Sequence, residues 1–505
     1  MSQIAGLADF RQEAPPADIG LFQFPASILV FNFIFSGTTY VCAVRAGVSG
    51  WVPLDYGTDP ATVIQSALNA LTVGRTWKEK VVLKGSFELS ASIEVFSYTS
   101  LILTDTQLTV PNGADYSIIK IEGTDVDHRN HVEIISGILE GDNPTANQHG
   151  IEMSYVFFSH FEHIYITKTN RGIYADGELR DSIFLDVVVR ETTGYGWFIW
   201  GDVAGGINEV TLFHCEAYAC TDWGVILNNI AGCRFIGFFS ASNTLGFRAS
   251  NGEGCFFILC DSDSNGAGTG YSFDNLNHSS MISCWSATND LGVEWSGSDG
   301  ISITGGFILN LNKEGIKLTS ITRAVILGVS VEHPASINPN LYDALHIIDS
   351  TRIIVRDSFL TDPHVTPTMR YGVYSEGTSD YVSVFGCDVS DAVTLGINLS
   401  VGVNNIVRGN IGFVTENNLL SPAFAIDAVA VVAVVIAHGL DVTPAVEDCQ
   451  LTLIEDTDVD DFTLGWIKVE STGAANVNCK VNVTGQSATG GATAKLALHV
   501  DLAAG

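Results

Sequence analysis

Three acidic side chains have the type and spacing for acid–base catalysis. They are Glu216, in the run HCEAY, and Asp261 and Asp263, in the run CDSD. They occupy similar positions two repeats apart, about 9.6 Å in a stack of strands. Side-chain reach can shorten this to the roughly 6.5–9.5 Å between the carboxyl groups of an inverting glycosidase. The sequence therefore offers these residues as catalytic candidates, although in a chain with 56 acidic residues solvated turn carboxylates are the alternative.

Aromatic side chains near the same positions could bind sugars. Exposed Trp and Tyr stack on pyranose rings, whereas buried ones fill a core. Trp200 and Trp223 lie at predicted turn edges, and Tyr218 follows Glu216 by two residues. We expect these three to contact glycan, and we expect Trp197 and Trp295 to be buried.

Metal sites have little support in the sequence. Asp261-Ser-Asp-Ser-Asn-Gly266 resembles the first half of a calcium loop, but the twelfth position is Ser272 rather than Glu. The acidic run Asp456–Asp461 is a second place where cations could gather. We find neither a Cys-x-x-Cys pair for zinc nor the acids and base of a metal-assisted lyase. The prediction is no cofactor, with Ca²⁺ as the one alternative.

A glycine repeat supplies the elements that must position these residues. A glycine followed by alternating apolar and polar residues recurs at intervals of 22 to 28 residues, with one interval of 57 that hides a degenerate copy at Ala344–Ile347. The repeat glycines are Gly150, Gly172, Gly196, Gly224, Gly246, Gly270, Gly292, Gly315, Gly372 and Gly396. The period of 2 indicates strands. Repeating short strands without helices predict a parallel β-helix.

The repeat also predicts which side chains point inward. Four cysteines lie eight to ten residues before their glycines, so we expect them in a core column: Cys215, Cys260, Cys284 and Cys387. The second residue after each glycine forms a predicted outward column: Glu152, Tyr174, Phe198, Ile226, Arg248, Ser272, Glu294 and Lys317. Glu294 and Lys317 should pair. The apolar members Tyr174, Phe198 and Ile226 predict a trimer interface or a sugar-binding face; a shift in phase would instead bury them.

Both ends of the repeat differ from its middle. Residues 1–50 contain strand-like runs at Ser27–Ser36 and Thr38–Arg45. A helix over residues 60–71 follows, with Thr58 or Asp59 as N-cap and Pro60 in its first turn. It would cap the open first coil. From residue 421 five strand-like runs predict a small β-sandwich: Val429–Ile436, Gln450–Ile454, Thr463–Glu470, Asn476–Val483 and Thr493–Leu502.

Composition excludes two classes of partner. The 505 residues carry a net charge of −32 with only 24 basic residues, which disfavours nucleic acid and anionic membrane surfaces. The apolar run Ile28–Phe35 is too short to span a bilayer. Such acidity suits a halophilic source or an ordinary acidic secreted or virion protein. The first residues lack a secretory signal, so we expect release by lysis or within a particle.

Two segments carry a resemblance to known proteins. Residues 55–68, DYGTDPATVIQSAL, resemble the GDGxxDDTxAIQxAI segment that opens pectate-lyase-like β-helices, including many viral tailspikes. Lys80–Gly85 resembles their first coil, with Lys84 in place of the usual proline. Residues 436–444 resemble a segment of small C-terminal domains in viral tail and fibre proteins. The resemblance implies a right-handed β-helix over about residues 50–415 and leaves the chemistry open, because the superfamily includes lyases, hydrolases and adhesins.

The sequence thus predicts an all-β protein in three parts. Residues 1–50 would attach it to other virion proteins, residues 51–420 would form a right-handed parallel β-helix with a capping helix, and residues 421–505 a β-sandwich for trimerisation or binding. We expect a homotrimeric tailspike, fibre or surface-decoration protein of a virion that engages host polysaccharide or glycoprotein. An active polysaccharide hydrolase or lyase and a purely structural virion component are the alternatives.

Overall fold

The computed structural model describes residues 27–413, except 48–49, 267, 400 and 403, together with several strands that follow. These later segments are residues 416–420, 424–425, 429–437, 449–457, 462–473, 476–485 and 493–501. Of the predicted attachment segment, residues 1–26 lie outside the described part. The chain divides into two compact units, Met1–Asp222 and Trp223–Gly505, and each is described by itself.

The first unit begins with an antiparallel sheet of three strands, which confirms the two predicted strand runs. These are β1 (Ile28–Phe35), β2 (Thr38–Gly47) and β3 (Gly50–Gly57). Ser36 and Gly37 connect β1 and β2 with φ values of 51° and 80°, as a two-residue hairpin turn requires. On its other edge β1 pairs in parallel with β4 (Glu79–Glu88), so the sheet continues into the coils.

The predicted helix is present as α2 (Pro60–Asn69), two residues shorter than expected. Asp59 is the N-cap and accepts from the Thr62 amide at 3.3 Å, which satisfies a free N–H of the first turn. The Gln65 side chain donates to the Glu94 carbonyl at 3.2 Å and accepts from the Glu94 amide at 2.8 Å. The helix thereby supplies hydrogen bonds to the edge of β5 (Ile93–Glu94); its role as a cap stays a prediction.

Each coil of the first unit contributes strands to three parallel ladders. Ladder A contains β4, β6 (Thr99–Ile102), β10 (Glu133–Ile135), β14 (His160–Glu162), β18 (Ile183–Leu185) and β22 (Thr211–Phe213). Ladder B contains β4, β7 (Thr106–Thr109), β11 (Ile138–Glu140), β15 (Tyr165–Thr167), β19 (Val188–Arg190) and β23 (Glu216–Tyr218). Ladder C contains β5, β8 (Ile119–Glu122), β12 (His149–Ser154), β16 (Arg171–Asp176) and β20 (Trp197–Trp200).

Short strands extend ladder C at its far end: β9 (Arg129–Asn130), β13 (Val156–Phe157), β17 (Leu179–Arg180) and β21 (Ile207–Asn208).

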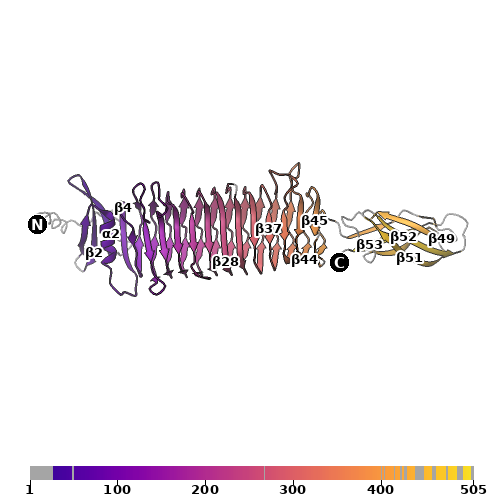
Figure 1. Cartoon of the computed structure of the whole chain (residues 1–505), viewed down its shortest axis with the longest axis horizontal. Helices are drawn as coiled ribbons and strands as arrows, with labels where there is room; N and C mark the ends of the chain where they lie inside the picture. Colours follow the sequence, from indigo (N-terminus) through magenta and orange to yellow (C-terminus); the bar gives the residue numbers. More distant parts are fainter. Residues whose placement is uncertain are drawn as a thin grey trace. The chain divides into compact units, whose positions relative to one another are not determined.

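The second unit continues with three parallel ladders of the same kind, in which Figure 1 marks β28, β37, β44 and β45. Its ladder A contains β26 (Arg234–Ile236), β29 (Phe256–Ile258), β32 (Ser280–Ile282), β35 (Ile301–Thr304), β38 (Ala324–Leu327), β41 (Thr351–Arg356), β44 (Asp380–Phe385) and β46 (Ile406–Arg408). Its ladder B contains β27 (Phe239–Ala241), β30 (Asp261–Asp263), β33 (Trp285–Ala287), β36 (Phe307–Leu309), β39 (Ser330–Glu332) and β42 (Phe359–Thr361). Its ladder C contains β24 (Trp223–Asn228), β28 (Leu245–Glu253), β31 (Thr269–Asn277), β34 (Leu291–Ser296), β37 (Ile316–Thr319), β40 (Leu345–Ile348), β43 (Tyr371–Glu376) and β45 (Leu395–Leu399), with the short β25 (Ile230–Ala231) beside β28. The predicted parallel β-solenoid is confirmed.

The repeat glycines are explained by lack of space rather than by backbone conformation. None of the ten has a positive φ. A Cβ on Gly172 would lie 2.2 Å from Cγ1 of Val189, and one on Gly246 would lie 2.3 Å from the Gly270 carbonyl oxygen. Ladder C and ladder B approach so closely at these positions that only glycine fits.

The core contains the predicted columns. In the first unit Ile151, Ile173 and Trp197 are matched in register and fully buried. The predicted core cysteines Cys215, Cys260, Cys284 and Cys387 are buried free thiols, and both Trp197 and Trp295 are fully buried. These predictions are confirmed.

The second unit also has a buried polar ladder that the sequence analysis missed. Asn243, Asn265 and Asn289 are nearly or fully buried. The Asn243 amide group donates to Oδ1 of Asn265 at 3.1 Å, and that of Asn265 donates to Oδ1 of Asn289 at 3.2 Å. Each side chain thus satisfies its neighbour at the turn that follows ladder B.

The predicted C-terminal strands are present and form two antiparallel groups. One contains β47 (Glu416–Leu420), β48 (Phe424–Ala425), β50 (Cys449–Thr457) and β53 (Thr493–Asp501). The other contains β49 (Val429–Ala437), β51 (Phe462–Thr472) and β52 (Asn476–Gly485). Their packing as a sandwich stays a prediction, and residues 438–444 of the fibre-like segment lie outside the described residues.

Candidate functional site

An aromatic cluster covers the outer side of ladder C in the first unit. Strands β12, β16 and β20 place Glu152, Tyr174 and Phe198 in one register column, and all three side chains are half-buried. The Tyr174 and Phe198 rings lie 5.4 Å apart. The predicted outward column therefore exists in this unit.

Two further rings extend the cluster. Trp200 stacks on Phe198 at 5.6 Å with an interplanar angle of 11° and is 37% exposed, and Tyr195 lies 5.3 Å from Phe198. We call Tyr174, Tyr195, Phe198 and Trp200 the aromatic face. An exposed indole backed by further rings is a surface on which a pyranose can stack.

One arginine lies among these rings. The Arg171 guanidinium lies 4.6 Å from the Tyr174 ring and 4.5 Å from the Phe198 ring. His149, on the adjacent strand, lies 4.4 Å from Tyr174. Burial lowers the pKa of His149 to about 3, helped by the positive charges of Arg171 and Lys120. The imidazole is therefore neutral at physiological pH, and Arg171 supplies the positive charge.

Glu216 is engaged in an ion pair on β23. Arg190 donates from Nε to Oε1 of Glu216 at 2.7 Å, and this hydrogen bond raises the pKa of Arg190. The Arg190 guanidinium also lies 5.2 Å from the ring of Tyr218, which is 37% exposed.

Asp261 and Asp263 lie together on β30 in the second unit. Both are half-buried and point outward on either side of the buried Ser262. Burial raises the pKa of Asp261 to about 6, and the negative charge of Asp263 adds to the shift. Oδ1 of Asp261 is buried and has no hydrogen-bond partner. A carboxyl group with this pKa can hold a proton near neutral pH and donate it.

Aromatic side chains flank Asp261 in its register column. Phe239 precedes it on β27, and Trp285 and Phe307 follow it on β33 and β36. The rings of Trp285 and Phe307 lie 5.6 Å apart, with exposures of 38% and 49%. The sequence analysis named Asp261 but not the exposed rings of Trp285 and Phe307 beside it. The signal for Trp285 was available, because Asp261 and Trp285 each follow one of the phase-matched core cysteines.

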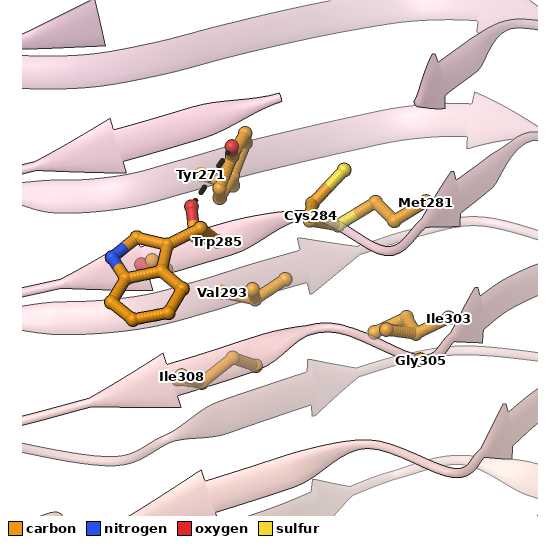
Figure 2. Close-up of a pocket in the computed structure, with 9 residues that line it drawn as sticks. Tyr271, Met281, Cys284, Trp285, Val293, Ile303, Gly305 and Ile308 are labelled. Carbon is orange, nitrogen blue, oxygen red and sulfur yellow. Dashed lines mark hydrogen bonds between the residues drawn. The ribbon is translucent and has the colours of Figure 1, made fainter. Parts of the chain in front are cut away.

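The inner side of the Trp285 strand faces a small, mostly apolar cavity. Figure 2 shows the Tyr271 hydroxyl donating to the Trp285 carbonyl, a hydrogen bond of 3.1 Å. Tyr271, Met281, Cys284, Val293, Ile303 and Ile308 are among the lining residues. The cavity belongs to the core, so only the outer, exposed side of Trp285 is available to a sugar.

The remaining predicted residues, Trp223, Ile226, Glu294 and Lys317, differ in exposure and in partners. Trp223 is half-buried, with the Arg248 guanidinium 6.0 Å from its ring. Ile226 is 6% exposed, and its interface role stays a prediction. The predicted pair of Lys317 and Glu294 is confirmed at 3.3 Å.

Two polar side chains of the predicted half calcium loop are hydrogen-bonded within the protein. The Ser262 hydroxyl donates to the Gly270 carbonyl at 2.8 Å, and Oδ1 of Asn265 accepts from the Asn243 side chain. The described residues contain no group of three or more His, Cys, Asp or Glu that could hold a metal. Residues 458–461 of the second acidic run lie outside the described part, and the Ca²⁺ alternative stays a prediction.

A buried charge network in the second unit was also missed. Asp343 is fully buried and accepts from Arg370 at 2.9 and 2.7 Å. Nδ1 of His346 lies 3.4 Å from Oε1 of Glu314, and Nε2 lies 3.2 Å from Oε1 of Glu376. Burial acts to raise the pKa of Glu314, but the His346 hydrogen bond and charge outweigh it and the pKa is lowered. The sequence showed His346 only as part of a degenerate repeat.

Comparison with solved structures identifies the fold. The A-module of mannuronan C-5 epimerase AlgE6 from Azotobacter vinelandii is 16% identical, with a TM-score of 0.53 over 70% of this chain and 95% of that module. The AlgE4 A-module from the same organism is 12% identical, with a TM-score of 0.54 over 70% of this chain and 96% of the module. The chain has a parallel β-helix fold similar to that of these modules.

A phage tailspike structure is less similar to this chain. Tailspike protein 3 of bacteriophage CBA120 is 12% identical, with a TM-score of 0.46 over 81% of this chain and 68% of that chain. No protein-family model matches the sequence, and no curated protein matches it either. In the described part, no helix is both long and apolar enough to cross a membrane.

Proposed function

We propose that the protein is a tailspike, fibre or surface-decoration protein of a virus and that it engages glycans on the host cell surface. The observation that carries this proposal is the aromatic face, where the exposed Trp200 stacks on Phe198 outside the solenoid. A sugar ring buries its apolar face against such a surface while its hydroxyl groups stay in water. Trp223 and Tyr218 are additional glycan contacts in this proposal.

The attachment and assembly of the protein follow from the resemblance of its opening segment to viral β-helices. In this proposal residues 1–50 bind other virion proteins, and the chain acts as a homotrimer. Tyr174 and Phe198 suit either a subunit contact or a sugar contact. Trp200 beside them favours the sugar, because its indole remains 37% exposed.

The test is binding of the purified protein to host cells and to their isolated surface polysaccharide. Trp200→Ala should weaken binding about tenfold or more, because a stacked ring contributes roughly 1 kcal/mol beyond its buried area. Trp77→Ala is the matched control, since Trp77 is 56% exposed and lies outside the aromatic face. Equal loss in both variants would place the glycan contact outside the aromatic face, and no binding by the unaltered protein would argue for a purely structural virion component.

A polysaccharide depolymerase is the second candidate, favoured by the raised pKa of Asp261 beside exposed rings. Asp261 would donate a proton to the leaving oxygen, while Trp285 and Phe307 held the sugar. Asp263 lies beside Asp261 on β30 and adds its negative charge, and Glu216, in the first unit, is a separate catalytic candidate.

Release of oligosaccharides from host polysaccharide tests this activity. Asp261→Asn and Glu216→Gln should abolish release while binding persists, and Asp125→Asn, an exposed aspartate, should leave it unchanged. Intact polysaccharide after incubation with the unaltered protein would rule out depolymerase activity and leave glycan binding without catalysis as the proposed function.

A further inference from the structure

Arg171 differs from four other arginines that lie against aromatic rings. Arg129, Arg180, Arg190 and Arg370 each lie over a ring and are each held by a carboxylate, at 3.1, 3.0, 2.7 and 2.7 Å. Arg171 lies over three rings, those of Tyr174, Phe198 and Tyr195. It has neither an ion-pair partner nor a side-chain hydrogen-bond partner among the described residues, and its Nε is buried.

The surroundings of Arg171 leave its charge uncompensated. Its register partner His149 is 4% exposed, and Nδ1 of that imidazole is buried without a hydrogen-bond partner. Two acidic groups on β12 and β16 have other partners: Glu152 binds Lys120 at 3.4 Å, and Asp176 accepts from the Tyr174 hydroxyl at 3.1 Å. In a chain of net charge −32, an arginine held by rings and without a carboxylate has room for an anion from outside.

We propose that Arg171 is the receptor for an anionic group on a sugar that stacks on the aromatic face. This inference rests on the proposed glycan binding and names its class: a pyranose that carries a carboxylate, sulfate or phosphate. The planar guanidinium matches such oxyanions with two parallel N–H donors. The rings fix its orientation, which reduces the entropy lost on binding. Trp200 and Phe198 define where the pyranose lies.

Four small sugars test the inference by saturation-transfer NMR and by quenching of tryptophan fluorescence. They are methyl glucoside, methyl glucuronide, glucose 6-sulfate and glucose 6-phosphate. At least one anionic sugar should bind about tenfold or more tightly than the glucoside, because hydrogen bonds to a charged group are the strong ones. Comparison of the three anionic sugars shows whether Arg171 prefers a carboxylate, a sulfate or a phosphate.

Three variants locate the effect. Arg171→Met keeps the aliphatic stem on the rings and should reduce anionic sugars to the affinity of the glucoside. Arg171→Lys keeps the positive charge but loses the two parallel N–H donors of the guanidinium, so it should retain only part of the preference for anionic sugars. Arg234→Met removes an exposed arginine of β26 and should change nothing.

Each outcome decides a separate point. Equal binding of neutral and anionic sugars, unchanged by Arg171→Met, would overturn the anion receptor and leave glycan binding intact. Binding of none of the four sugars would overturn the receptor, while host-cell binding would still decide the proposed function. Protection of Trp200 from acrylamide quenching in the sugar-free protein would also overturn it, since the face would then be a contact between copies of the chain.

Discussion

Asp261 and Trp285 occupy matching register positions on the neighbouring strands β30 and β33. A half-buried carboxyl group with one unpartnered oxygen therefore lies beside an indole that is 38% exposed. The residues are 24 positions apart in the sequence, and one coil of the solenoid brings them together. Their proximity supplies both a proton donor and a stacking surface.

Asp261 should make stability depend on pH. Its folded-state pKa of about 6 lies above the ordinary value of 3.8, so the folded protein binds this proton more tightly than the unfolded chain. The resulting stabilisation is complete below pH 3.8 and is lost as pH rises through 6. Asp261→Asn should raise Tm at pH 8 by about 1–3 °C and flatten the Tm profile between pH 4 and 7. Asp125→Asn should retain the slope; a lower Tm for Asp261→Asn at pH 8 would contradict the assignment.

A methyl group at a repeat glycine should destabilise the first unit. Gly172→Ala places a Cβ 2.2 Å from Cγ1 and 2.7 Å from Cγ2 of Val189, and such overpacking costs about 1–3 kcal/mol. At Gly57 the nearest atom would be 3.5 Å away, so Gly57→Ala is the control and should be nearly neutral. Denaturant unfolding measures both. Adding Val189→Ala to Gly172→Ala should recover part of the loss; no recovery would place the clash elsewhere.

Breaking the buried asparagine ladder at one residue should lower the free energy of unfolding by more than the loss of a single hydrogen bond would. In the native protein, Oδ1 of Asn265 accepts hydrogen bonds from both the backbone amide and the side-chain amide of Asn243. Asn265→Ala removes this acceptor. Each buried group left without a partner costs about 1–3 kcal/mol. Asn208→Ala, at a half-buried position of the short strand β21, provides the comparison. Urea midpoints that are equal for the two variants would show that water replaces the lost partners.

The buried pair of Arg370 and Asp343 should be far more sensitive than an exposed pair of the same type. Arg370→Met leaves Asp343, which is fully buried, without its counter-ion and should cost about 3–5 kcal/mol. Arg323→Met breaks a similar pair with Asp299, in which the arginine side chain is 52% exposed, and should cost far less because solvent screens an exposed pair. Thermal unfolding of both variants checks the ranking. Adding Asp343→Asn should restore part of the stability lost in Arg370→Met.

Much of the fold was readable from the sequence because its signals are local. Alternation after each repeat glycine assigned Ile173 to the core and Tyr174 to the outside, and the phase of Cys260 and Cys284 placed them in the core. The N-cap at Asp59 and the proline after it located α2. Its last turn was misplaced by two residues, since Leu71 is buried beyond the helix end and extends the apolar pattern.

The sites depend on relations that no local pattern contains. Coils differ in length, from 22 residues between Gly150 and Gly172 to 28 between Gly196 and Gly224, so counting residues alone does not give the register between every pair of coils. The sequence equally could not distinguish Arg171 from Arg190. Neither is adjacent to an aromatic residue in the sequence, and only the packing of strands gives Arg190 its partner Glu216 and leaves Arg171 among rings. The sequence by itself determined the solenoid and its inner face, because strand alternation and glycine spacing are properties of a single coil. Only the tertiary structure decided which charges are paired, because each pair joins residues on neighbouring coils.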